Sequence, residues 1–349
     1  MLAALLPAPA AAQFGKNKIQ YQRFDWKIYH SPHFDMYYYP EEEALLQRVV
    51  SFAESAYDEL SRRLDYQIES STPLIFYKTH AEFEQNNIQL GFIEEAVGAF
   101  ATDVRFRMVL PVDLPDAELH ELVLHELTHI FQYHLLFNGK VSRSLTAQPP
   151  GWLIEGMASY YAKDESTSDK MVLRDAVVND LVPAIAKAQG SSYFQYRFGH
   201  AVFDFMESRW GAQGVLDFLF EYRSTLGGSI DRAVKRAFRI EAEDFDADFR
   251  RWLRDKYLTE LVKTGEPSYF GRRFFGEEGR GAEYFAPAVS PSGDLVGAIG
   301  NPKDDLDVVL FDSRARKPLR DLTKGWSTEY QHLSGQYLGE RRRSGSDLA

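Results

Sequence analysis

The chain has 349 residues, and 51 Asp and Glu against 40 Lys and Arg give it a formal net charge of −11. This acidic balance argues against a nucleic acid or an anionic membrane as the main partner, and no segment approaches the ~20 consecutive apolar residues of a transmembrane helix. The length suits about two domains with buried cores, and the absence of cysteine excludes a disulfide framework.

The first residues have the composition of an export signal. Residues 1–12 are mostly Ala, Leu and Pro, and they include the Ala-x-Ala pattern of a signal-peptide cleavage site. The segment is short and lacks a basic beginning, so we expect a truncated signal peptide, with a plain apolar leader as the alternative. This predicts an exported protein of the bacterial envelope, periplasmic or extracellular.

Residues 34–112 predict a small mixed sheet with helices. Residues 34–39 have a strand pattern, and Pro40 with three following Glu marks the start of a helix that runs to about residue 64, since acidic residues suit a first helical turn. Further strands are expected at residues 73–77, 98–104 and 106–112, with a short helix at residues 81–87 between the first two.

A long helix with an unusual polar centre is predicted from about residue 114 to 138. Its apolar positions recur at helical spacing, and its middle reads His125-Glu126-Leu127-Thr128-His129. Residues four apart on a helix differ by only about 40° in direction, so His125 and His129 can hold one metal ion between them, with Glu126 beside it. A solvated polar face is the alternative, but buried imidazoles without a partner are costly.

Glu155 is the best candidate for a third ligand. It lies in a second predicted helix that begins after Pro149-Pro150-Gly151. A catalytic zinc ion takes three protein ligands and leaves a fourth position for water, whose pKa it can lower to about 7. The expected site is therefore Zn²⁺ held by His125, His129 and Glu155, with Glu126 as the general base.

The remaining chain predicts a helical half and then a β-rich segment. Helical patterns cover residues 175–189, 196–210, 215–222 and 245–257, which gives an α+β domain over residues 14–265 with a cleft between two lobes. We expect a linker at residues 266–282. Strands are then predicted on both sides of a Ser-Pro-Ser-Gly-Asp turn within residues 286–299, and again at residues 306–312.

Four segments give the chain its resemblance to gluzincin zinc peptidases of the peptidase MA-like group. They are residues 125–129, residues 152–158 with a Glu-Gly-x-Ala signature, the Tyr-x-x-Gly element at residues 196–199, and residues 98–102 before the metal helix. The resemblance implies a zincin-like fold. It also implies that the Tyr196 hydroxyl stabilises the oxyanion and that residues 98–102 pair with the substrate backbone at a sheet edge.

The C-terminal segment resembles one blade of a TolB-like β-propeller, in which a Ser-Pro-x-Gly turn recurs in each four-stranded blade. Because propellers use about four to eight blades, residues 283–349 are expected to be an incomplete propeller segment. The alternative is a plain β-rich appendage. The propeller resemblance implies a possible envelope protein partner and speaks to fold rather than activity.

Other polar residues near the motif fit the site less well. A metzincin is disfavoured because Gln132 and Leu135 stand where that class needs glycine and histidine. His134 points away from the shared face of the helix, and His120 is expected at the surface or behind a ligand. His200 could orient a substrate, although an ordinary helix histidine is the simpler reading, and Ser159 could steady a ligand.

The sequence thus predicts an exported zinc-dependent peptidase that hydrolyses peptide or protein substrates. The alternative is a catalytically silent envelope protein that uses a peptidase-like platform and a propeller to bind partners. A complete set of ligands and base favours the enzyme, since loss of catalysis would be expected to remove one of them first.

Overall fold

The computed structural model describes residues 22–88, 93, 97–102, 105–137, 149–185, 192–225, 229–265, 267–272, 274–275, 284–300 and 307–323. The predicted signal peptide at residues 1–12, residues 276–283 of the predicted linker and propeller segment, and residues 324–349 lie outside the described residues. The chain divides into two compact units, Met1–Asp255 and Lys256–Ala349, whereas the sequence predicted a first domain that ends at residue 265.

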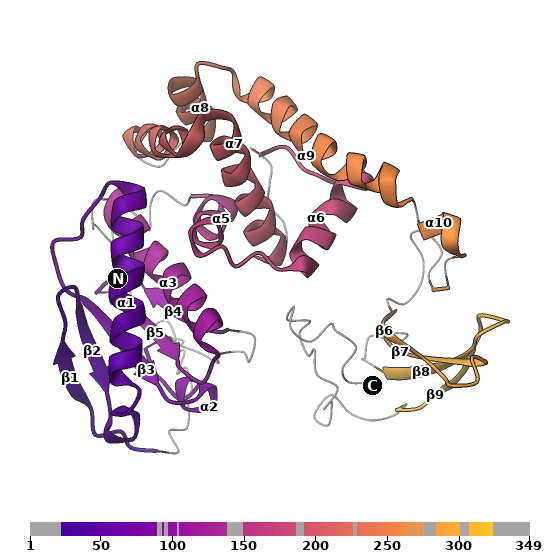
Figure 1. The fold of residues 1–349 in the computed structure, drawn as a ribbon, viewed down its shortest axis with the longest axis horizontal. Coiled ribbons are helices and arrows are strands. Elements are labelled where there is room, and N and C mark those ends of the chain that lie inside the picture. Colours follow the sequence, from indigo (N-terminus) through magenta and orange to yellow (C-terminus); the bar gives the residue numbers. More distant parts are fainter. Residues whose placement is uncertain are drawn as a thin grey trace, which may run out of the picture. The chain divides into compact units, whose positions relative to one another are not determined.

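The first unit contains a five-stranded mixed sheet in the order β1-β2-β3-β5-β4. Its strands are β1 (Lys27–His30), β2 (Phe34–Tyr38), β3 (Thr72–Tyr77), β4 (Phe100–Thr102) and β5 (Arg107–Pro111). β2, β3 and β5 run parallel, while β1 and β4 are antiparallel to their neighbours. The mixed sheet is confirmed, with β1 as an unpredicted edge strand and β4 as the opposite edge (Figure 1).

Both faces of the central strands are covered. On one face, Phe34 of β2 contacts Tyr57 of the helix α1 (Leu46–Leu64). On the other face, Ile75 of β3 and Val109 of β5 pack in a cluster that includes Phe83. Strands that are buried on both faces are rich in apolar residues without alternation, which is why residues 73–77 could be recognised as a buried strand.

Helices make up the rest of the first unit. They are η1 (Pro40–Glu42), α1, α2 (His80–Phe83), α3 (Asp116–Phe137), α5 (Gly151–Ala162), α6 (Thr167–Val178), α7 (Ser192–Ser224), α8 (Ile230–Phe238) and most of α9 (Ala242–Thr264). α7 has a kink at Gly211, where φ is 71°, and this kink accounts for the two helices predicted on either side of it. α8 was not predicted.

The helix expected over residues 175–189 is wrong in position. The observed helix α6 ends at Val178, and Asp180 has a φ of 54°, outside the helical region. Its start is fixed by Ser166, whose hydroxyl accepts a hydrogen bond from the backbone N–H of Asp169, while the Asp169 carboxylate accepts from the Ser166 backbone. This reciprocal capping box outweighs the apolar periodicity further along the chain.

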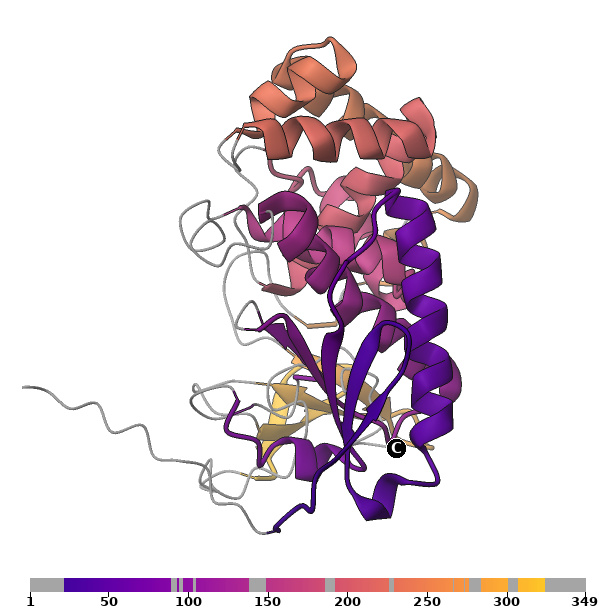
Figure 2. The same ribbon diagram turned by 90° about the vertical axis from the view of Figure 1, so that its left-hand side faces the viewer.

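α5 and α7 cross with their backbones in contact, and both views of the fold place them side by side (Figures 1 and 2). The crossing point is Gly156 of α5 against Gly199 of α7. A Cβ atom added to Gly199 would lie 2.1 Å from the carbonyl oxygen of Trp152, and one added to Gly156 would lie 2.3 Å from the Cα of Gly199. The Glu-Gly-x-Ala and Tyr-x-x-Gly elements are therefore joined by a contact that only glycine allows.

Gly199→Ala is expected to destabilise the protein by ~1–3 kcal/mol, the usual cost of overpacking a tight interior contact. The neighbour that would have to move is backbone, which cannot change rotamer. Urea unfolding measures the change. Gly98→Ala is the matched control, since its Cβ would meet Leu122 at an ordinary 3.7 Å. An equal free energy of unfolding for Gly199→Ala and Gly98→Ala would contradict this account of the crossing.

The second unit has a short helix, α10 (Pro267–Phe270), and a four-stranded antiparallel sheet in the order β6-β7-β8-β9. The strands are β6 (Tyr284–Val289), β7 (Leu295–Gly300), β8 (Asp307–Asp312) and β9 (Pro318–Asp321). Val296, Ala298, Val309 and Phe311 form its small core. Among the described residues this sheet is open, with β6 and β9 at its edges.

The turn between β6 and β7 is the predicted Ser-Pro-Ser-Gly-Asp segment. Gly293 has a φ of 75° and its backbone N–H donates to the carbonyl of Ser290. The Ser290 hydroxyl accepts from the backbone N–H of Leu295. Glycine is needed at the position with positive φ, so the turn follows directly from the local sequence. Within the described part of the chain, no helix is both long enough and apolar enough to span a membrane.

Candidate metal centre

Two adjacent helices carry the predicted metal ligands. His125, Glu126 and His129 lie in the middle of α3 and are buried, and Glu155 lies in the second turn of α5. α3 packs against α5. α5 begins where the sequence predicted, after Pro150, whose carbonyl accepts the backbone N–H of Leu153. The structure therefore brings the three predicted ligands to one place.

The donor atoms of these residues converge. The Nε2 atom of His125 lies 3.6 Å from Glu155 Oε2, and the Nε2 atom of His129 lies 3.5 Å from the same oxygen. All three ligand atoms lie within 4.8 Å of one another. Tetrahedral zinc with ligand distances of about 2.0–2.2 Å requires its ligands to be ~3.3–3.5 Å apart, so the separations fit.

Glu155 Oε2 is itself an unusual atom. It is buried and has no hydrogen-bond partner. Burying a carboxylate oxygen without a hydrogen-bond partner costs free energy. A metal ligand is expected to have such an oxygen, facing the other ligand atoms, when its ion is absent. The unpaired Oε2 atom of Glu155 therefore fits a cation that is bound between the three residues.

The second nitrogen of each imidazole is held by a hydrogen-bond acceptor. His125 Nδ1 lies 3.0 Å from Asp164 Oδ2, and His129 Nδ1 lies 2.9 Å from Gln132 Oε1. The orientation of the Gln132 amide is set because its Nε2 donates to the carbonyl of Ile154 at 2.7 Å. Each Nδ1 therefore carries a proton, and in the neutral ring each Nε2 offers a lone pair to a metal.

The electrostatics of the centre favour positive charge. Burial lowers the pKa of His125, but the hydrogen bond with Asp164 and the facing carboxylate of Glu155 outweigh burial and raise the pKa to about 10. Burial opposes ionisation of Glu155, yet the facing His129 and His125 hold the pKa of that carboxyl well below its usual range.

Glu126 lies beside the three predicted ligands and is not one of the residues whose donor atoms converge. Its Oε2 is buried and has no hydrogen-bond partner, and its carboxylate accepts a hydrogen bond from the backbone of Ala101 in β4. Burial raises the pKa of Glu126, while the charges of His129 and His125 oppose that rise. A buried carboxylate with a raised pKa is suited to accept a proton in a reaction near neutral pH.

Tyr196 reaches the centre from α7. Its ring stacks on the ring of His125, with the centroids 5.6 Å apart and an interplanar angle of 18°. Burial, followed by the negative charge of Glu155, raises the pKa of Tyr196 well above its usual range. Its hydroxyl therefore stays protonated and can donate a hydrogen bond. All five predicted site residues are gathered from α3, α5 and α7.

A buried network behind His125 was not predicted. Asp164 accepts hydrogen bonds from Ser159 Oγ at 2.5 Å and from Arg197 Nη1 at 3.0 Å, besides facing His125. Arg197 also pairs with Asp169 at 2.9 Å. Ser159 thus steadies a ligand only indirectly, through Asp164. Asp164 has no motif that marks it in the sequence.

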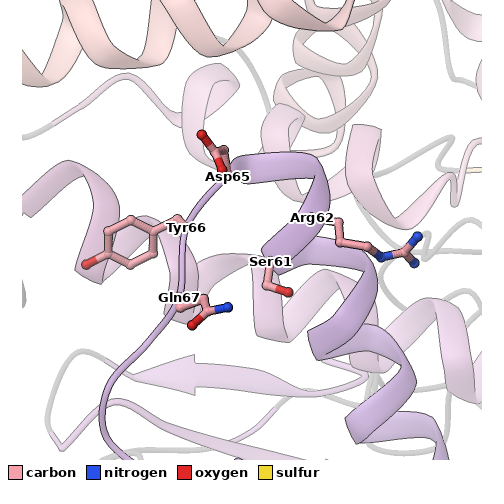
Figure 3. Close-up of a pocket in the computed structure, with 5 residues that line it drawn as sticks. All are labelled: Ser61, Arg62, Asp65, Tyr66 and Gln67. Atoms are coloured by element: carbon pink, nitrogen blue, oxygen red, sulfur yellow. The ribbon is translucent and has the colours of Figure 1, made fainter.

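The other histidines and the surface pocket lie apart from the ligands. His134 packs against the ring of Phe106 and His120 against that of Phe52, and neither belongs to the group of converging donor atoms. A pocket at the end of α1 is lined by Ser61, Arg62, Asp65, Tyr66 and Gln67 (Figure 3). None of the predicted site residues lines it, and the Arg62 and Tyr66 side chains point in opposite directions.

Comparison of the sequence with models of known protein families gave no match, and comparison with curated proteins gave no significant match. The functional argument therefore depends on the site itself.

Proposed function

We propose that the protein is a zinc-dependent peptidase of the gluzincin type, with His125, His129 and Glu155 as the metal ligands. The observation that carries this proposal is the convergence of two imidazole nitrogens on one buried carboxylate oxygen that has no other partner. Zinc bound there would polarise a substrate carbonyl and lower the pKa of water to about 7.

The surrounding residues supply the other parts of a peptide hydrolysis. Glu126 would accept a proton from the attacking water and pass it to the leaving amine, which is worth about 10²–10⁴-fold in rate. Tyr196 would donate a hydrogen bond to the oxyanion that forms on the substrate carbonyl. The stacking of the Tyr196 ring on the ring of His125 supports this role, because it brings the Tyr196 side chain next to a proposed ligand.

β4 is a suitable place for the substrate backbone. It is the edge strand of the sheet, next to α3, and the backbone of Ala101 already bonds to Glu126. An extended peptide can add to such an edge as a further strand. This arrangement supports the sequence-based prediction that residues 98–102 bind substrate.

The second unit is proposed to be a single propeller blade. Its four antiparallel strands and its Ser-Pro-Ser-Gly-Asp turn support this assignment, and a protein partner in the bacterial envelope is the associated proposal. Export, periplasmic or extracellular, is proposed from the composition of residues 1–12.

Cleavage of a diverse peptide library tests the proposed activity. Zinc-loaded protein and a Glu126→Gln variant are incubated with the library, and products are identified by mass spectrometry. We expect cleavage by the parent protein alone, at positions that reveal whether the cuts are internal or terminal. No cleavage by either protein, with zinc bound to both, would favour a binding protein instead.

Asp164→Asn is expected to weaken zinc binding about 10–100-fold, as is usual when the hydrogen-bond partner of a ligating histidine is changed. The amide removes the charge that fixes the protonated nitrogen of His125. A competition titration with a chelator measures the affinity. Asp175→Asn, on the exposed face of α6, is the control, and equal zinc affinity in the two variants would contradict the role of Asp164.

A further inference from the structure

Two arginines lie where β4 turns into β5. Arg105 is exposed in the turn, and Arg107 is the first residue of β5 and is partly buried. The strand register pairs Arg107 with Thr102, the last residue of β4. β4 is the edge strand on which the proposed function places the substrate backbone. The two arginines therefore lie at one end of the proposed substrate strand.

Contacts with α3 hold this turn in place. Arg105 and Phe106 both have positive φ, 65° and 47°, a conformation that is unfavourable for a bulky side chain and that persists where surrounding contacts enforce it. The ring of Phe106 packs on the rings of Tyr133 and His134, with the centroids 6.1 and 4.8 Å apart. Tyr133 follows His129 by one helical turn. The turn is thus attached to the helix that carries two of the proposed metal ligands.

The guanidinium of Arg107 has no partner among the described residues. Its Nε atom is out of contact with solvent and has no hydrogen-bond acceptor. Burial, followed by the charge of Arg105, lowers the pKa of Arg107, although an arginine side chain stays protonated. By contrast, Arg48, Arg63 and Arg197 each pair with a carboxylate. Arg107 is therefore a positive group that the fold removes in part from water without a negative partner, which is unfavourable.

Strand alternation determines the face of the sheet on which Arg107 lies. Val109, two residues later on β5, belongs to the cluster that includes Phe83, and Phe100, its partner on β4, packs against the same cluster. Side chains two residues apart on a strand share a face, and so do those of directly opposite residues on neighbouring strands. Arg107 and Thr102 therefore lie on the face of this cluster.

A peptide added to β4 brings a side chain within reach of Arg107. The peptide residue opposite Thr102 has its side chain on the same face of the sheet. Its backbone is two strand spacings from that of Arg107, about 9.5 Å, and an extended arginine and a glutamate side chain together span this separation. The C-terminal carboxylate of a peptide lies in the line of the strand itself. A side-chain carboxylate is therefore the group that fits.

We propose that Arg107, assisted by Arg105, binds an acidic side chain of the substrate, so that the protein selects peptides with Glu or Asp opposite Thr102. This inference rests on the proposed peptidase function and names the class of its substrate. A guanidinium suits a carboxylate because its N–H donors form a fork that can bond both oxygens. The substrate carboxylate also supplies the acceptor that the buried Nε of Arg107 lacks.

Binding of labelled peptides tests the proposal. The zinc-loaded Glu126→Gln variant is titrated with extended peptides that have an amidated C-terminus and carry Glu, Gln or Lys at one position at a time, and binding is followed by fluorescence anisotropy. At one position, the Glu peptide is expected to bind about tenfold more tightly than the Gln peptide, as a charged hydrogen bond would give. The preference should shrink at high salt, and kcat/KM of the parent protein should show the same preference.

Substitution of Arg107 tests its part in this selection. Arg107→Gln should abolish the preference, and Arg107→Glu should reverse it in favour of the Lys peptide, a result that loss of folding cannot produce. Arg232→Gln and Arg232→Glu, at an exposed position of α8, are the matched controls. They change the net charge by the same amounts and should keep the preference of the parent.

The outcomes separate the role of Arg107 from the peptidase itself. Cleavage by the parent without preference for an acidic residue at any position, or with a preference that Arg107→Gln retains, would overturn the role of Arg107 and leave the peptidase intact. A Glu preference in binding that Arg107→Gln abolishes, with no cleavage of any bound peptide by the parent, would support the role of Arg107 and remove the proposed peptidase.

The comparison of peptides on the parent protein needs no Arg107 variant. A preference that appears only when the peptide has a free C-terminal carboxylate would overturn the choice of a side-chain carboxylate. Binding of none of the peptides would overturn the proposal as a whole.

Discussion

Glu126→Gln is expected to lower the rate of peptide cleavage by about 10²–10⁴-fold while zinc binding is retained. The substitution removes the proton acceptor without touching a ligand. It should not destabilise the fold, because the buried Oε2 of Glu126 has no hydrogen-bond partner to lose and burial already raises the pKa of the carboxyl. Turnover, zinc content and the melting temperature are measured on the same preparation.

The same substitution at Glu118, about two turns earlier on α3, is the matched control and should keep full activity. A Glu126→Gln variant that retained most of the parent turnover would show that another group accepts the proton. A variant that lost its zinc would show that Glu126 belongs among the ligands, against the geometry that places it beside them.

Glu155→Gln is expected to weaken zinc binding by more than ~10²-fold, since even a change behind a ligand costs about 10–100-fold. The charged oxygen that faces both imidazoles becomes a neutral amide. Peptide cleavage should fall with the zinc and should recover in part at high zinc concentration. Chelator competition measures the affinity, and cleavage is assayed over a range of free zinc.

Glu243→Gln, on the exposed surface of α9, is the control for this substitution. Equal zinc affinity in the Glu155 and Glu243 variants would remove Glu155 from the ligand set. Lower affinity in the Glu155 variant with activity unchanged at every zinc concentration would separate the metal from the catalysis and contradict the proposed function.

The convergence of the proposed ligands could be predicted from the sequence because their pattern is local. His125 and His129 lie one helical turn apart, and Glu155 lies in a short helix whose start is marked by Pro150 and Gly151. The same holds for Tyr196, which is placed by its helix and by the glycine three residues later that contacts α5.

The support behind the ligands could not be predicted in the same way. Asp164 faces His125 because Lys163, with a φ of 57°, ends α5 and turns the chain back. A lysine in that conformation has no sequence signature, since glycine is the residue expected there. Gln132 could more readily have been predicted as the partner of His129, because residues three apart on a helix are neighbours.

The fold was predicted where apolar patterns were strong and missed where they were weak. The buried strand β3 and the long helix α3 were both found. β1 is exposed at every residue, so it has no apolar alternation to detect. β9 is also mostly exposed, so it was missed for the same reason. The predicted position of α6 was wrong because the prediction followed apolar residues later in the chain and overlooked the capping box at Ser166.

The most direct test of the central claim is a crystal structure of zinc-loaded protein with anomalous diffraction measured at the zinc absorption edge. We predict an anomalous peak between His125 Nε2, His129 Nε2 and Glu155 Oε2. A well-ordered structure of zinc-loaded protein with no peak among these three atoms would contradict the account.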